Sequence, residues 1–223
     1  MPKWFLIVLS VSFAAIGSTV LTTGGCVSKE PMPQITYDYE HEKAIAPRRP
    51  AISKHQPREH VYENIPSEWM PPVFLERNWT AIILHHSATD NGNAAIFDKW
   101  HREENNWEGV GYDFVIGNGS DSGNGQVEVT YRWSNQKTGA HCGGTPGNWA
   151  NREGVGICLV GNFNKYPPTP QQLRSLVRLI RFLQDRYGID ANRIYGHNTT
   201  PGGRITDCPG QYFPMWELKA SLR

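Results

Sequence analysis

The sequence predicts an α/β domain, in which short buried strands alternate with helices along the chain. Apolar runs rich in β-branched residues recur between polar or glycine-rich segments, which is typical of strands inside a sheet. Between them lie stretches whose apolar residues are three and four positions apart, as in helices that cover a sheet. No internal repeat interrupts this order, so we expect one folded domain.

The first half of the domain supplies three strands and one helix. Residues 80–85 form an apolar run that ends in a polar cluster, so we expect a buried strand with a functional site at its end. A helix is predicted over residues 93–105. Two further strands, at residues 112–116 and 126–129, are separated by a turn of Gly, Asn and Ser.

The second half contains the clearest helix. Residues 155–160 read as another buried strand, and residues 170–187 carry an apolar stripe at helical spacing. Thr169 is a natural N-cap for this helix, and Gly188 is a typical residue at which a helix ends. A last strand and a terminal helix are predicted at residues 194–197 and 216–222.

Net charge and the amount of apolar sequence limit the partners. The chain has 223 residues, with 22 Lys and Arg against 21 Asp and Glu, a formal net charge of +1. This balance gives no electrostatic reason for binding a polyanion, so we expect no nucleic-acid partner. We also expect a monomer, because no surplus apolar element remains once the core has been assigned.

The N-terminal residues predict export. Residues 1–26 combine Lys3 with an apolar run at 4–16, which is too short and interrupted for a bilayer-spanning helix. The end of this segment resembles the lipobox of bacterial lipoproteins, with Cys26 as the lipidated residue. A plain cleaved signal and an uncleaved anchor are the alternatives. We expect a lipoprotein of the cell envelope, anchored in the membrane and facing the periplasm or the cell wall.

A proline-rich segment follows the signal. Residues 27–72 contain eight prolines among charged residues and have no sustained apolar period. Proline removes backbone donors and disfavours helix before it, so this stretch is predicted to be an extended linker. The folded domain is then expected over residues 73–223.

Three residues of zinc-binding type lie at predicted strand ends and in loops. They are His85, His197 and Cys208. The loop between His197 and Cys208 is long enough to bring both side chains to one point, but spacing alone leaves open whether they share a metal.

An ordered set of motifs adds a family resemblance. The motifs are His85-His86-Ser87-Ala88-Thr89, Trp100-His101 with Trp107, Gly111-Tyr112-Asp113-Phe114, Gly139-Ala140-His141, Gly156-Ile157-Cys158-Leu159-Val160-Gly161, Gly196-His197 and Cys208-Pro209. With these motifs the chain resembles the zinc N-acetylmuramoyl-L-alanine amidases, which include amidase-type phage lysozymes and peptidoglycan recognition proteins, from about Trp79 to Trp216. This resemblance implies a central mixed β-sheet flanked by helices, with zinc at the floor of a groove.

The resemblance implies one Zn²⁺ per chain, held by His85, His197 and Cys208. Neighbouring residues of a strand point to opposite faces, so His86 is expected to pack or to lie behind the ligands. Two imidazoles and one thiolate leave a fourth tetrahedral position for water, which is typical of a catalytic zinc site.

The same resemblance gives Tyr112 and Thr206 catalytic roles. The implied reaction is hydrolysis of the amide bond between the lactyl group of N-acetylmuramic acid and L-alanine, by a zinc-activated water. Tyr112 and Thr206 would stabilise the oxyanion. A packed core tyrosine is the alternative for Tyr112.

Three residues are predicted to bind the substrate, which is peptidoglycan or muropeptides. His141 is expected to line the groove, with a structural role as the alternative. Trp107 could stack on a sugar face or belong to the core or rim. Glu153 stands where the family often has Asn-Ser, and its carboxylate would favour a cationic group of the substrate.

Two other functions remain open at this stage. Noncatalytic recognition proteins of this family typically lose a zinc ligand, usually the cysteine, so the presence of Cys208 favours an enzyme. A zinc endopeptidase that cuts within the stem peptide would use the same chemistry at an amide bond.

Overall fold

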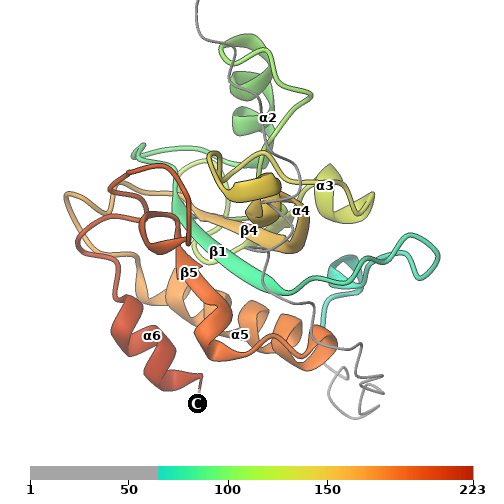
Figure 1. Cartoon of the computed structure of the whole chain (residues 1–223). Helices are drawn as coiled ribbons and strands as arrows, with labels where there is room; N and C mark the ends of the chain where they lie inside the picture. Colours follow the sequence, from blue (N-terminus) through green and yellow to red (C-terminus); the bar gives the residue numbers. More distant parts are fainter. Residues whose placement is uncertain (1–64, 223) are drawn as a thin grey trace, which may run out of the picture. The chain divides into compact units, whose positions relative to one another are not determined.

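The protein folds around one mixed β-sheet, as the computed structural model shows for residues 65–222 (Figure 1). The five strands have the order β3-β2-β4-β1-β5. Strand β1 pairs in parallel with β4 and β5, β4 pairs in parallel with β2, and β2 pairs antiparallel with β3. The strands are β1 (Ala81–His86), β2 (Phe114–Ile116), β3 (Val127–Val129), β4 (Gly154–Leu159) and β5 (Ile194–Gly196). The predicted α/β class and mixed sheet are confirmed.

Helices α5 (Pro170–Tyr187) and α6 (Met215–Ser221) cover one face of the sheet (Figure 1). Helix α5 begins with a capping box, in which Thr169 and Gln172 each bond the other's backbone N–H, and it ends at Gly188 with a φ of +67°. Its apolar stripe packs with the sheet in the main hydrophobic core. This core includes Ile82 and Leu84 of β1.

Short helices cover the opposite face. Helix α4 (Trp149–Glu153) packs against β1 and β4, and Ala150 shares a small apolar cluster with Ala81 and Ile83. Helices α3 (Tyr131–Ser134) and α4 were not predicted from the sequence, because helices of four or five residues are too short to show a helical period. Helix α2 (Ala94–Glu103) begins where Glu128 of β3 accepts a bond from the backbone N–H of Ala94, at 2.5 Å.

The folded domain begins earlier than position 73. Residues Ser67–Trp69 form a short 3-10 helix, and the Trp69 side chain is only 2% exposed in the main core. The indole of Trp133 donates a hydrogen bond to the Trp69 carbonyl oxygen, at 2.9 Å. The expected linker boundary is therefore wrong at its C-terminal end, because one large apolar ring ties this proline-rich stretch to the core.

The export segment, Cys26 and most of the linker lie outside the described residues. Among residues 65–222, none of the helices has both the length and the apolar character needed to cross a bilayer.

Candidate metal centre

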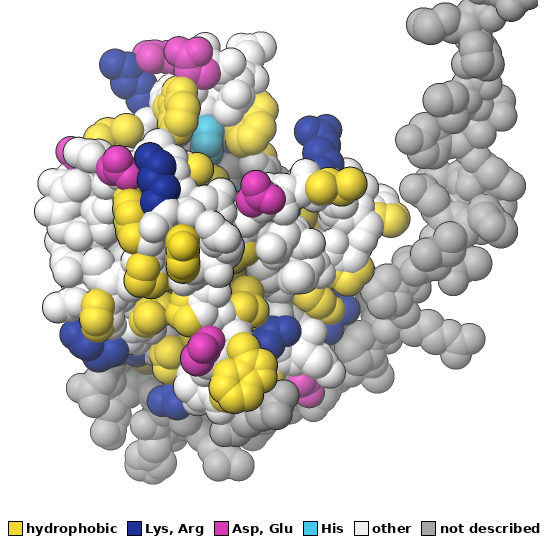
Figure 2. All heavy atoms as spheres, turned by 90° about the vertical axis from the view of Figure 1, so that its left-hand side faces the viewer, with side chains coloured by type: hydrophobic (Ala, Val, Ile, Leu, Met, Phe, Trp, Pro, Cys, Tyr) yellow, Lys and Arg dark blue, Asp and Glu magenta, His cyan; other side chains and the backbone are white. Residues whose placement is uncertain are grey.

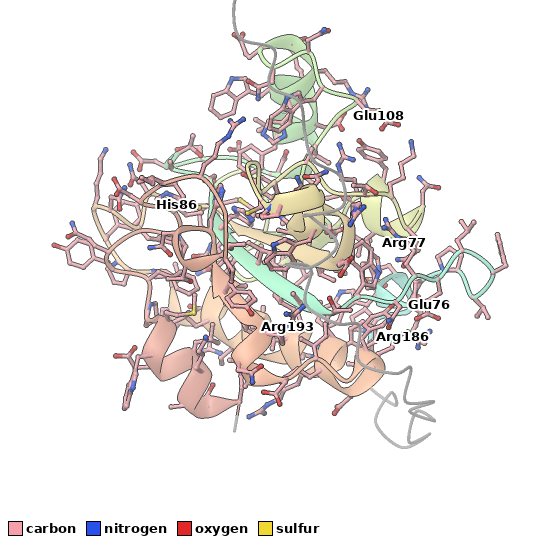
Figure 3. All side chains as sticks on the ribbon, in the orientation of Figure 1. Glu76, Arg77, His86, Glu108, Arg186 and Arg193 are labelled. Atoms are coloured by element: carbon pink, nitrogen blue, oxygen red, sulfur yellow. The ribbon has the colours of Figure 1, made fainter. Side chains whose placement is uncertain are left out.

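The two histidines at the end of β1 point to opposite faces of the sheet, as predicted. His85 pairs in register with Cys158 of β4. His86 turns to the α5 side, where its Nδ1 accepts a hydrogen bond from the backbone N–H of Phe163, at 3.1 Å. The ring of Phe163 lies 5.8 Å from that of His86. Figure 3 shows His86 at one end of β1 and the Glu76–Arg186 ion pair towards the other end.

His85, His197 and Cys208 come together as the sequence analysis predicted. Their ligand atoms all lie within 4.8 Å of one another. The Nδ1 atom of His85 is 3.6 Å from the Cys208 sulfur, and the rings of His85 and His197 are 4.8 Å apart. The topology explains the meeting, because His197 follows β5 directly and β5 is the parallel neighbour of β1.

The chemistry of this donor set fits a zinc ion. Burial lowers the pKa of His85 and of His197, so both imidazoles are neutral and able to bind a metal. The Nε2 atom of His197 is buried and has no hydrogen-bond partner among the described residues. Burial also raises the pKa of the Cys208 thiol to about 12, so a cation must replace its proton if the thiolate is to form.

Thr206 lies beside the cysteine. Its Oγ1 accepts a hydrogen bond from the backbone N–H of Cys208, at 3.2 Å. The backbone N–H of His86 in turn donates to the Cys208 sulfur, at 3.4 Å. The loop is thereby tied to the end of β1, and Thr206 is hydrogen-bonded to the cysteine of the cluster.

Tyr112 also reaches the cluster. Its ring centroid lies 5.2 Å from that of His85. Burial raises the pKa of Tyr112 well above its usual value, and the neighbouring Cys158 and Cys208 raise it further. The phenol is therefore protonated at neutral pH and can act as a hydrogen-bond donor.

Trp107 stands at the rim of the site, 42% exposed. Its ring lies 4.9 Å from the ring of His101, which is 5.7 Å from Tyr112. His101 accepts a hydrogen bond from the backbone N–H of Gly111, at 3.1 Å, and thus joins α2 to the segment that carries Tyr112. The sequence analysis gave His101 no role, although it belongs to a quoted motif. Figure 2 shows one face of the molecule, on which hydrophobic side chains lie near a surface histidine.

Two predicted substrate-binding residues are placed differently. His141 is only 7% exposed, and its ring nitrogens face the His85 ring and the Gly154 carbonyl oxygen, which supports the structural alternative. Glu153 immediately precedes β4, at the strand end opposite to Cys158, and its carboxylate lies 3.7 Å from Arg152. The structure therefore does not bring Glu153 to the cluster.

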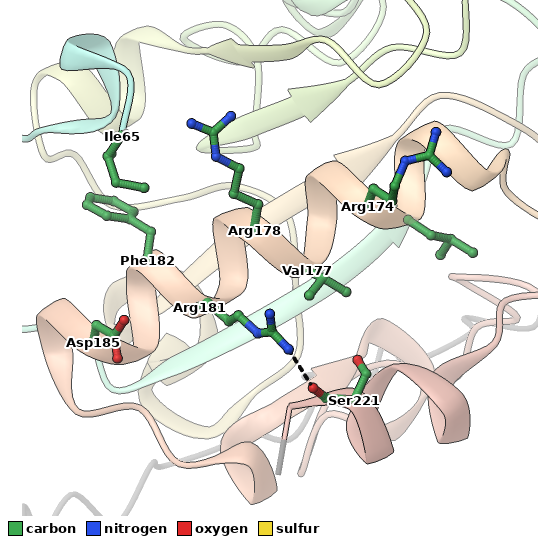
Figure 4. Close-up of a pocket in the computed structure, with 9 residues that line it drawn as sticks. Ile65, Arg174, Val177, Arg178, Arg181, Phe182, Asp185 and Ser221 are labelled. Carbon is green, nitrogen blue, oxygen red and sulfur yellow. Dashed lines mark hydrogen bonds between the residues drawn. The ribbon is translucent and has the colours of Figure 1, made fainter. Parts of the chain in front are cut away.

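A separate pocket lies along the outer side of α5 (Figure 4). Its lining includes Ile65, Val177 and Arg181, and the Arg181 guanidinium donates a hydrogen bond to the Ser221 carbonyl oxygen, at 3.0 Å. None of the residues that line this pocket belongs to the His-His-Cys cluster, so the chemistry of the cluster does not extend to it.

Comparison with known proteins points to the same family as the motifs of the sequence analysis. The model of the N-acetylmuramoyl-L-alanine amidase family matches residues 75–211. A peptidoglycan recognition protein of Trichoplusia ni is 31% identical over 158 residues, which cover 65% of this chain and 79% of that protein.

Solved structures show the same fold. The N-acetylmuramoyl-L-alanine amidase LysC from Clostridium intestinale is 33% identical, with a TM-score of 0.54 over 65% of this chain and 85% of that one. Bumblebee PGRP-SA, at 24% identity, shares the fold with a TM-score of 0.52 over 65% of this chain and 83% of that one. The proteins similar to this chain thus include some named for catalysis and some named for recognition.

Proposed function

The chain belongs to the N-acetylmuramoyl-L-alanine amidase family, and from this premise we propose that it is a zinc-dependent amidase. The proposed reaction cleaves the amide bond between the lactyl group of N-acetylmuramic acid and L-alanine of the peptidoglycan stem peptide. The substrate is peptidoglycan or a muropeptide. The observation that carries the proposal is the convergence of His85, His197 and Cys208 within 4.8 Å.

The cysteine favours catalysis over binding alone. A thiolate and two neutral imidazoles are three ligands of a tetrahedral zinc site and leave one position for a reacting group. When bound, zinc would act as a Lewis acid towards water and the scissile carbonyl. A recognition module would not need this open position.

The chain's own residues complete the site. The Tyr112 hydroxyl keeps its proton at neutral pH because burial raises its pKa, so it can donate a hydrogen bond to the carbonyl oxygen as negative charge develops there. Thr206, held beside Cys208, offers a second hydroxyl group. Trp107 presents an exposed aromatic face at the rim, suited to stacking on a sugar ring.

The location of the activity follows from the N-terminal sequence. Residues 1–26 have the features of an export signal, and we place the enzyme in the cell envelope, where peptidoglycan is found. Lipid on Cys26 would anchor it to the membrane, with the domain working at a distance set by the linker.

Digestion of purified peptidoglycan tests the proposal. The full chain is incubated with zinc, or with a chelator, and released products are identified by mass spectrometry. We expect free peptides that begin with L-alanine, lost on chelation and reduced in Tyr112→Phe. Fragments cut within the stem would make the protein an endopeptidase, and wall that is bound but uncut would make it a recognition module.

A further inference from the structure

The ring of His141 occupies a slot that two glycines leave open. A Cβ at Gly156 would lie 2.4 Å from the imidazole, and a Cβ at Gly139 would lie 2.5 Å from it. Both distances are shorter than any real contact of a Cβ atom, so a side chain at either position would displace the ring. The two glycines therefore leave the room in which the His141 ring packs against the face of the sheet that carries His85.

Hydrogen bonds connect this ring to the metal cluster. His141 Nε2 lies 3.3 Å from the carbonyl oxygen of Gly154, and His141 Nδ1 lies 3.1 Å from Nε2 of His85. The other nitrogen of His85, Nδ1, faces the Cys208 sulfur at 3.6 Å. The contacts therefore run from the Gly154 carbonyl oxygen through His141 to His85, and from His85 to the Cys208 sulfur.

The direction of these bonds follows from the carbonyl. A carbonyl oxygen only accepts, so Nε2 of His141 carries the hydrogen and Nδ1 of that neutral ring is an acceptor. The bond between the rings then requires the hydrogen of His85 on Nε2. The lone pair of His85 is left on Nδ1, the atom beside Cys208.

The backbone that carries His141 is itself held in place. The side-chain oxygen of Asn151 accepts hydrogen bonds from the backbone N–H groups of His141 and Cys142, at 2.8 and 2.9 Å. Its amide donates to the Cys142 carbonyl oxygen and to Asn148, at 3.1 and 2.7 Å. Asn151 is buried and was missed in the sequence analysis, since its partners come from a loop without a pattern.

We propose that His141 is a positioning residue that selects the tautomer and ring orientation of His85, so that Nδ1 of His85 faces the metal. This inference rests on the metal site of the proposed function and assigns His141 to that site rather than to the substrate. Partners that bond the second nitrogen of a ligand histidine typically change metal affinity by about 10- to 100-fold.

Two measurements on the full chain test the inference. Zinc affinity is measured by competition with a chelator for wild type, His141→Leu and His141→Asn. Leucine removes the acceptor and should weaken zinc binding by about 10- to 100-fold. Asparagine keeps an acceptor oxygen near the place of Nδ1 and should restore much of the affinity. Leu179→Ala, which leaves a cavity on the other face, is the control for general destabilisation and should keep wild-type affinity.

The tautomer is read separately by nitrogen-15 NMR of histidine in the metal-free wild type. We expect His85 to carry its hydrogen on Nε2, and the two tautomers to mix in His141→Leu. Hydrogen on Nδ1 of His85 in wild type, or unchanged zinc affinity in His141→Leu, would overturn the inference. If wild type binds no zinc, the proposed function loses its metal, while the NMR pattern still decides the positioning. If the leucine variant does not fold, the wild-type tautomer and the asparagine variant decide it.

Discussion

The two faces of the sheet differ in chemistry, although β1 and β4 are buried along their whole length. Towards α5, strands β1 and β4 present large apolar side chains. Towards α4, the same strands present mostly small residues, together with one isoleucine, a histidine and a cysteine. The first set is Ile82, Leu84, Val155, Ile157 and Leu159, and the second is Ala81, Ile83, His85, Gly154, Gly156 and Cys158.

The α5 face therefore contributes most of the stability of the fold, whereas the α4 face carries the metal cluster. Apolar burial stabilises the fold in proportion to the area removed from water, and most of that area lies on the α5 face. Burying a polar group costs free energy unless the group is hydrogen-bonded or binds a cation, and on the α4 face His85 and His141 are paired in this way. Changes on the two faces should therefore affect different measured quantities.

The largest effect is expected from a ligand on the polar face. Cys208→Ser should lower kcat/KM by more than about 100-fold. Loss of a residue that only hydrogen-bonds a zinc ligand costs up to about 100-fold, and Cys208 is proposed as a ligand itself. The free energy of unfolding of the metal-free chain should change by less than about 1 kcal/mol, because Cys208 is not in the apolar core. Retained turnover would remove Cys208 from the mechanism. Activity assays and urea unfolding give the two numbers.

The reverse pattern is expected from the apolar face. Leu179 of α5 is fully buried, so Leu179→Ala should cost about 2–5 kcal/mol of unfolding free energy through the cavity it leaves. At temperatures where the variant remains folded, kcat/KM should match wild type. A comparable loss of kcat/KM would show that the two faces are not independent.

A pH-dependent effect should come from Asp113, which lies beside β4. Its Oδ2 accepts a hydrogen bond from the Gly156 N–H at 2.8 Å, while Oδ1 has no partner among the described residues. Burial raises the pKa of this carboxyl from 3.8 to about 7.

The sign of the effect follows from proton binding. Between these two values the folded chain holds a proton that the unfolded chain releases, so Asp113 lowers stability as pH rises from about 4 to 7. Asp113→Asn should remove this loss and be more stable than wild type above pH 7, by up to about 4 kcal/mol. Urea unfolding at pH 5 and pH 8 measures the difference in unfolding free energy between the variant and wild type. An equal difference at both pH values would contradict the assignment.

The smallest effect should come from the start of α5. Thr169→Ala breaks the capping box and should cost about 1 kcal/mol of unfolding free energy. Zinc affinity should not change, because Thr169 belongs to the helix that covers the apolar face. Urea unfolding and chelator competition together check both statements.

Much of the fold could be predicted because its elements carry strong local signals. The stripe and caps of α5 mark both of its ends, and the apolar run that leads to His85 marks β1, an inner strand of the sheet. The position of Trp69 could not be predicted, because a single aromatic residue among prolines has no period that distinguishes a core residue from a linker residue.

The site was predictable where residue type limits the role. His85 and His197 are metal-binding residue types at strand ends and Cys208 is one in a loop, and the family resemblance assigned all three to one site before the structure did. The place of His141 was not predictable, since the sequence does not show whether a histidine faces a groove or a second histidine. Gly139 and Gly156 carried the signal, but a glycine can mark any close approach.

The central claim is that the polar face of the sheet holds one metal ion through His85, His197 and Cys208. The most direct test is a calorimetric titration of the metal-free full chain with zinc. Wild type is compared with Cys208→Ser. We predict one zinc bound per wild-type chain and much weaker binding in the variant. Absence of zinc binding in wild type, or equal binding in both proteins, would contradict the account.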